Sequence, residues 1–201
     1  DGLGRSTSAL IKACSEDPIH DPEKLFVLAQ IAHFCLEYGH YDTARECVTH
    51  AMKVNELGNL YHAGVMAMIV NQQLLTIHPP ERINRILEQC ASRGEQLDVL
   101  TRHRVGCILE LVTCMQSAER LKDPELVEIA CFGVWNTVLP LLGTDVDRIE
   151  MILNTCSKAL EKIESGYHKL RILFHLELSK IFLGFGSGQK RAKRDLQSPW
   201  D

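Results

Sequence analysis

The sequence predicts an all-α protein built from antiparallel helical hairpins that follow one another along the chain. Apolar residues recur at helical spacing through most of the sequence, and Pro or Gly residues separate the periodic stretches at short intervals. Strand signals are almost absent. The chain has 201 residues, 45% of them hydrophobic, which is enough to bury one or two ordinary cores. About eight to nine helices fit this pattern.

Four hairpins are expected in order along the chain, after a short amphipathic piece over residues 7–15. Proline marks helix starts, as at Pro22 and Pro124, because its missing N–H is not needed in the first turn. Glycine marks the stops, as at Arg93-Gly94 and Ser165-Gly166. The expected pairs are 22–38 with 42–54, 58–76 with 81–92, 96–122 with 124–142, and 145–164 with 167–182.

Particular side chains indicate how these helices pack. The helix over 81–92 carries one apolar stripe, made of Ile83, Ile86, Leu87 and Cys90. In the third hairpin, Trp135 is expected to fill the seam between the helices. Pro140 is expected to kink or end the second helix of that hairpin.

The stretch over 28–55 has the most specific pattern in the chain. Three alanines let two helices approach closely, and Gly39 stands where a left-handed C-cap is expected. This spacing resembles the tetratricopeptide repeat (TPR), a helix-turn-helix unit of about 34 residues. Leu28 and Cys35 stand where the first helix of that repeat has tryptophan and tyrosine. The residues that match the repeat are Ala32, Gly39, Tyr41, Ala44 and Ala51.

The resemblance implies an α-solenoid, in which each hairpin buries its apolar stripe against its neighbours. Residues 1–183 would form a TPR-like segment of a longer chain, since the first residue is Asp1, and residues 184–201 a flexible basic linker or arm. Short loops also fit a closed helical bundle. The matching repeat favours the open array.

The eight cysteines favour a reducing, intracellular compartment. Each stands among apolar neighbours of a predicted helix, and none forms a CxxC motif. Buried free thiols explain this pattern better than a disulfide framework does. No apolar run reaches about 18 residues, so we expect a cytoplasmic protein without a membrane span.

No combination of residues indicates catalysis, so we expect a non-enzymatic protein with neither a cofactor nor a metal. His103, Cys107 and Cys114 share one helix face, but three ligands on one rod cannot surround a zinc ion. The Gly-rich stretch before Lys190 lacks the spacing of a phosphate loop. No Ser-His-Asp order or nucleophile elbow is present.

Basic residues indicate two possible partner-binding surfaces. Four cations stand within five residues of the C-terminal arm: Lys190, Arg191, Lys193 and Arg194. They can meet an acidic surface or remain a solvated linker. Arg102 and Arg104 could supply an anion clamp in the third hairpin. The net charge is −4 and the arm contributes +2, so the helical body carries −6, which disfavours nucleic acid as a partner.

Two functions fit these features. The first is a structural scaffold that contacts other protein subunits. The sequence pattern of residues 130–142 resembles that of large cilia- and flagella-associated scaffold proteins of the axonemal central apparatus. This resemblance implies an assembly role in a microtubule-based machine. The alternative is a peptide-binding TPR adaptor of a soluble cytoplasmic complex. In the matching repeat, Gln30, His33 and Glu37 would make a poor anion clamp.

Overall fold

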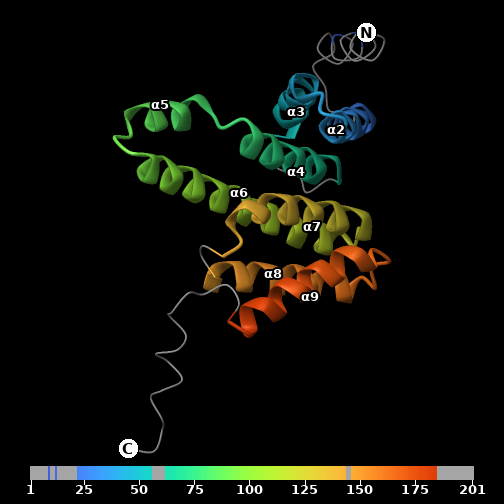
Figure 1. Cartoon of the computed structure of the whole chain (residues 1–201). Coiled ribbons are helices and arrows are strands. Elements are labelled where there is room, and N and C mark those ends of the chain that lie inside the picture. The colour runs from blue at the N-terminus through green and yellow to red at the C-terminus, as the bar shows by residue number, and fades with distance from the viewer. Residues whose placement is uncertain (1–8, 10–11, 13–21, 56–61, 144–145, 185–201) are drawn as a thin grey trace, which may run out of the picture. The chain divides into compact units, whose positions relative to one another are not determined.

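The computed structural model describes most of the chain (Figure 1): residues 9, 12, 22–55, 62–143 and 146–184. All regular secondary structure within these residues is helical, which confirms the predicted all-α class. They hold helices α2 to α9 and one 3-10 turn, at the lower end of the eight to nine helices expected. The amphipathic piece expected over 7–15 lies almost entirely outside the described residues.

The chain divides into two compact units, residues 1–137 and 138–201, and each is described by itself. The division falls at the end of α7, a place that the sequence did not single out. The predicted boundary between residues 183 and 184 stays a prediction, because residues 185–201 lie outside the described residues.

Helices α2 (Pro22–Glu37) and α3 (Tyr41–Asn55) pack together as the first hairpin, as predicted. Pro22 is the first residue of α2, where its missing N–H costs no hydrogen bond. Gly39 has a φ of +76°, and its N–H and that of the next residue donate to carbonyls in the last turn of α2. These two bonds make a Schellman C-cap, which confirms the left-handed position expected of Gly39.

Half of the residues of helix α4 (His62–Ile77) are buried, on several sides of the helix. It packs against α2, α3 and α6. A helix that is apolar nearly all round needs neighbours on several sides. The buried residues are Ala63, Gly64, Val65, Met66, Ala67, Ile69, Val70 and Leu74.

Helix α5 (Glu81–Gln89) lies beyond the end of α4 and contacts α6, which corrects the predicted pairing of 58–76 with 81–92 (Figure 1). With nine residues, α5 is too short to cover α4, whereas α6 has 29 residues and runs past both. No residue of α5 is buried, so its predicted apolar stripe is only partly covered.

Helix α6 (Arg93–Leu121) begins where the sequence predicted a stop, so the interpretation of Arg93-Gly94 as a helix end is wrong. The hydroxyl of Ser92 accepts from the N–H of Glu95 at 3.2 Å. The Glu95 carboxylate in turn accepts from the N–H of Ala91 at 2.8 Å. This reciprocal arrangement resembles a capping box, and it outweighs the tendency of glycine to end a helix.

Helix α7 (Pro124–Val138) ends in a 3-10 turn over Leu139–Leu141. One carboxylate oxygen of Asp123 accepts from the N–H of Leu126 at 3.1 Å and so caps the helix. The other lies 2.5 Å from Nδ1 of His62, and this pair ties the start of α7 to the start of α4. The α-helix stops two residues before Pro140, as expected of a residue that has no N–H to donate.

A glycine lets α7 approach its neighbours closely. A Cβ at Gly133 would lie 3.2 Å from the side chain of Gln73 in α4 and 3.3 Å from Cδ2 of Leu111 in α6. Two residues earlier in α7, Sγ of Cys131 lies 3.6 Å from Sδ of Met115 in α6. These contacts place α4, α6 and α7 around one core.

Helices α8 (Val146–Lys162) and α9 (His168–Phe182) form a hairpin in the C-terminal unit, as predicted for 145–164 with 167–182. The predicted stop at Ser165-Gly166 is displaced. Glu164, with a φ of +52°, is the left-handed residue, and the next N–H donates to the carbonyl of Leu160 at 3.0 Å. The Schellman bonds therefore close without glycine.

Candidate interaction site between helices α8 and α9

The α8–α9 hairpin has a well-packed apolar core. Side chains at helical spacing face inward on each helix. The buried set is Ile149, Ile152, Leu153, Cys156 and Leu160 on α8, with Leu170, Phe174 and Ile181 on α9. This core holds the side chains along the edge of the hairpin in fixed positions.

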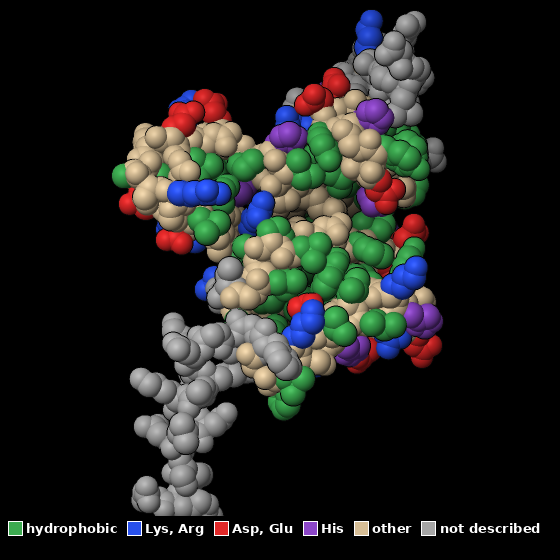
Figure 2. Space-filling model, viewed as in Figure 1, with side chains coloured by type: hydrophobic (Ala, Val, Ile, Leu, Met, Phe, Trp, Pro, Cys, Tyr) green, Lys and Arg blue, Asp and Glu red, His purple; other side chains and the backbone are tan. Residues whose placement is uncertain are grey.

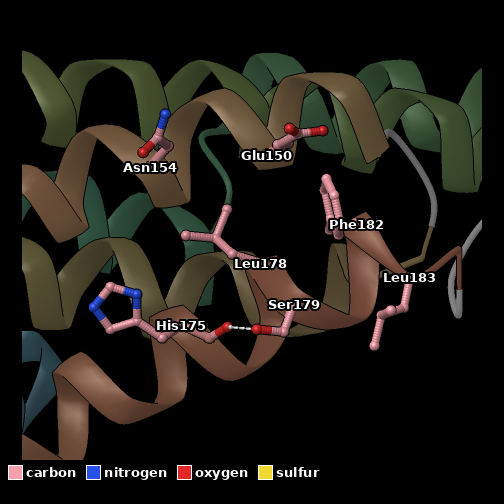
Figure 3. Close-up of a pocket in the computed structure, with 7 residues that line it drawn as sticks. All are labelled: Glu150, Asn154, His175, Leu178, Ser179, Phe182 and Leu183. Atoms are coloured by element: carbon pink, nitrogen blue, oxygen red, sulfur yellow. Dashed lines mark hydrogen bonds between the residues drawn. The ribbon is translucent and has the colours of Figure 1, made fainter.

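A groove of about 470 Å³ lies along one edge of this hairpin (Figure 3). Its volume is within the range of small-molecule and side-chain pockets, about 300–1,000 Å³. Both helices contribute to it. The lining residues are Glu150, Asn154, His175, Leu178, Ser179, Phe182 and Leu183. We call this feature the α8–α9 groove.

The two walls of the α8–α9 groove differ in polarity. The α8 wall is polar, with Glu150 and Asn154 one turn apart. The α9 wall becomes apolar towards the end of the helix, where the side chain of Phe182 is 81% exposed and that of Leu183 66%. A groove of this kind fits a peptide segment that combines bulky apolar side chains with hydrogen-bond donors.

His175 lies in the groove and ties α9 to α8. Its Nε2 is 3.3 Å from Oγ of Ser157 and 3.3 Å from a carboxylate oxygen of Glu161. In a Ser-His-acid triad the serine and the acid bind different ring nitrogens. Here both meet Nε2, and Ser157 is buried. The cluster therefore positions the imidazole ring and does not have the geometry that activates a nucleophile.

The alanines predicted to pack the repeat are buried in the first hairpin. Ala32, Ala44 and Ala51 are each 0% exposed. The ring of Tyr41 stands edge-on to that of His78, with 5.4 Å between the ring centres. Small buried side chains of this kind let helices approach closely, but the assignment of these residues to a TPR stays a prediction.

The two arginines predicted as an anion clamp do not share a face. Arg102 and Arg104 are two positions apart on α6, and such residues point to different sides of a helix. Arg102 is exposed, and its Nε donates to the carbonyl of Asp98 at 3.3 Å. The predicted basic cluster of the arm lies outside the described residues: Lys190, Arg191, Lys193 and Arg194.

His103 bonds to the backbone of a neighbouring helix. Its Nε2 lies 2.9 Å from the carbonyl oxygen of Leu75, in the last turn of α4, and 3.9 Å from Sγ of Cys107. Burial raises the pKa of Cys107 to about 11 and that of Cys114 to about 12. Both thiols are therefore protonated at neutral pH.

Sequence reasoning did not single out the α8–α9 groove. One signal that could have found it is a polar stripe on α8 with spacings of three and four: Asp147, Glu150, Asn154, Ser157 and Glu161. A second signal is the number of apolar residues on α9, which exceeds what one hairpin seam can bury.

No protein-family model matches the chain, and no solved structure is significantly similar to it. In the part of the chain that the structure describes, no helix has both the length and the apolar character needed to cross a bilayer.

Proposed function

We propose that this chain is a non-enzymatic scaffold segment that contacts other protein subunits of a large assembly. The observation that carries the proposal is an apolar face on α9 that the hairpin leaves uncovered. Ile172 is 61% exposed, Leu173 38% and Leu176 48%. Figure 2 shows apolar side chains among charged ones over this unit. Contiguous exposed apolar surface is typical of interaction sites.

Helix α2 and Tyr38, the residue that follows it, form a second exposed apolar face in the other unit. Phe26 is 48% exposed, Phe34 45% and Tyr38 66%. The rings of Phe34 and Tyr38 lie against each other, with 4.4 Å between their centres. Aromatic side chains are enriched in the energetic centres of protein interfaces. The chain therefore offers one apolar face on each unit for neighbouring subunits.

The proposed architecture is an open, TPR-like α-solenoid, in which such faces are covered by the next element of the array or by a partner. The resemblance of residues 130–142 to cilia- and flagella-associated scaffolds favours the axonemal central apparatus as the setting. The partners would then be protein subunits associated with microtubules.

Cross-linking mass spectrometry of the tagged full-length protein in ciliated cells tests the scaffold role. Ile172→Glu with Leu176→Glu places two charges on the α9 face, and we expect the cross-links between this face and other subunits to disappear. Gln116→Glu with Asn136→Glu, which adds the same two charges at exposed positions elsewhere, is the matched control and should retain them. An unchanged set of cross-links in the α9 variant would overturn the proposal. A diffuse distribution of the tagged protein in the cytosol would overturn the axonemal setting.

A peptide-binding adaptor is the second candidate, and the α8–α9 groove favours it. Fluorescence anisotropy with short labelled peptides tests this function. Saturable micromolar binding that Asn154→Ala weakens would place the peptide in the groove. Binding of acidic peptides that only Arg102→Ala or Arg104→Ala weakens would place it on α6 instead.

A further inference from the structure

Helix α9 combines exposed apolar surface with an excess of positive charge. Among the described helices, it alone has more basic than acidic residues: Lys169, Arg171 and Lys180 against Glu177. The carboxylate of Glu177 lies 2.5 Å from Nζ of Lys180. Lys169 is exposed and has no ion-pair partner among the described residues. The outer side of α9 therefore keeps a positive charge that the chain itself does not compensate.

Lys169 belongs to the same side of α9 as the exposed apolar residues. Ile172 and Leu173 follow it by three and four positions, and Leu176 follows it by seven. Residues at these spacings are neighbours on the surface of a helix. We call these four residues the α9 face. An apolar face with a cation at its start fits a partner helix that carries apolar side chains and a carboxylate.

The exposed side of α2 has the features that such a partner needs. Phe34 follows Phe26 by eight positions and Tyr38 follows Phe34 by four, so the three rings lie on one side of the helix. Glu37 stands on the same side, and its side chain is 58% exposed. Its Oε1 lies 3.6 Å from Nε2 of His33, which is longer than a hydrogen bond. We call Phe26, Phe34, Glu37 and Tyr38 the α2 face.

The two faces match in charge and in spacing when the helices run antiparallel. Glu37 lies near the end of the α2 face and Lys169 at the start of the α9 face, so antiparallel helices bring these charges together. Phe34 precedes Glu37 by three positions, and Ile172 follows Lys169 by three. The aromatic ring then meets an aliphatic side chain, and burial of both is favourable by about 25 cal/mol for each Å² of apolar surface.

A contact between two identical faces lacks this match. Two α9 faces would meet without an opposing carboxylate, because Glu177 is bound to Lys180. Two α2 faces would leave both Glu37 side chains without a cation from the other copy. Unpaired or like charges at a contact disfavour it relative to the alternative that pairs them. Charge therefore favours the mixed contact, α2 with α9.

We infer that the α2 face of one copy of this chain packs against the α9 face of a second copy. Because the two faces differ, the contact is heterologous. A pair of copies keeps one free α2 face and one free α9 face, to which further copies can bind. This inference rests on the proposed scaffold role and names another copy of the chain as the subunit that covers both faces.

Sedimentation velocity of the full chain tests this contact with two variants that each block one face. Phe34→Glu with Tyr38→Glu blocks the α2 face, and Ile172→Glu with Leu176→Glu blocks the α9 face. We expect the unchanged chain to form oligomers larger than a dimer as its concentration rises. Each variant alone should be monomeric. An equimolar mixture of the two should form a dimer and nothing larger, because each variant retains the face that the other lacks.

Gln116→Glu with Asn136→Glu, at exposed positions outside both faces, is the matched control and should associate as the unchanged chain does. An unchanged chain that stays monomeric, or a mixture that does, would overturn the inference. A dimer of either blocked variant alone would assign a contact between identical faces and would overturn it as well. The scaffold role is tested separately, by cross-links to other subunits in cells, so the two proposals can fail independently.

Charge reversal tests the antiparallel register. Glu37→Lys and Lys169→Glu should each weaken self-association about twofold to fivefold, the range expected of an exposed ion pair. Both substitutions in one chain should restore it. Lys158→Glu, at an exposed position on α8, is the matched control for Lys169→Glu and should leave self-association unchanged. A double variant that associates no more tightly than the single ones would contradict the pairing of Glu37 with Lys169.

Discussion

Gly106 and Gly133 both lie inside helices, but only Gly133 is closely surrounded by side chains of other helices. A methyl group at Gly133 would lie 3.2 Å from Gln73 and 3.3 Å from Leu111, and Leu111 is fully buried. At Gly106 no heavy atom lies within 4 Å of the added carbon. The same substitution should therefore change stability in opposite directions.

We expect Gly106→Ala to raise the free energy of unfolding by about 0.5–1 kcal/mol, since alanine favours the helix. Gly133→Ala should lower it by about 1 kcal/mol, because packing strain of about 1–3 kcal/mol exceeds the gain in helix propensity. Urea denaturation of both variants measures the difference. Changes of the same sign would contradict this account.

Trp135 is 9% exposed in α7. Removal of such a large buried side chain leaves a cavity, so Trp135→Ala should cost about 3–5 kcal/mol in the free energy of unfolding. Trp135→Phe should cost less, because it retains most of the apolar volume. Denaturation curves that show a loss below about 1 kcal/mol for the alanine variant would instead mark Trp135 as a partner contact.

Three helix ends show what residue identity predicts about a C-cap. Gly39 was predictable because glycine favours positive φ. Lys122 and Glu164 adopt the same conformation, with φ of +57° and +52°, and close the same pair of hydrogen bonds. Lysine and glutamate carry no local signal for this geometry, so only the structure locates these two caps.

At the scale of elements, the start of α6 depends on the Ser92 cap. Ser92→Ala removes the hydroxyl that accepts from Glu95, and should destabilise the first turn by about 1 kcal/mol. Residues 91–98 are exposed, so the effect should be local, with faster hydrogen exchange over residues 93–97.

Ser117→Ala, at the other end of α6, is the control for this cap. Its hydroxyl only donates to the carbonyl of Thr113 within the same helix, at 3.0 Å. It should leave exchange at the start of α6 unchanged. Equal exchange rates in Ser92→Ala and the unchanged protein would contradict the role of the cap.

The pairing of helices shows the limit of pattern reasoning at this scale. Because α4 and α5 follow one another in the sequence, they were predicted to pair. Instead, α4 packs against α2, α3 and α6. The apolar pattern of α4 states that the helix is buried. It does not state which surface covers it, because many apolar surfaces are equivalent in free energy per unit area.

At the scale of the whole molecule, buried thiols make the free energy of unfolding depend on pH in the alkaline range. A cysteine thiol ordinarily has a pKa of 9.0, and burial raises the pKa of Cys35 above this value. Burial raises the pKa of Cys107 to about 11 and the pKa of Cys114 to about 12. The folded chain keeps protons that the unfolded chain releases. This stability is fully present below about pH 9 and is lost as the pH rises through the folded values.

We therefore expect the free energy of unfolding to fall between about pH 9 and 11, by at most about 1.4 kcal/mol per pH unit for each thiol. Urea denaturation in the presence of a reductant measures this fall. Cys107→Ala with Cys114→Ala should be less stable at pH 7 but lose less over this range. An equal loss in both proteins would contradict the assignment to these thiols.

The sequence by itself determined the helical class, most helix boundaries and the Gly39 turn. These properties depend on residues within a few positions of each other, where apolar periodicity, proline and glycine act directly on the backbone. It also predicted buried cysteines, which holds for the described ones except Cys90, which is only partly covered.

Only the tertiary structure decided which helices meet, and therefore where the α8–α9 groove lies. Glu150 and His175 are 25 positions apart in the sequence and line one groove because α8 and α9 fold back on a shared core. The same holds for His62 and Asp123, which meet across 61 positions. Such contacts depend on how several helices share the burial of apolar surface, a property of the whole packing arrangement that no local pattern encodes.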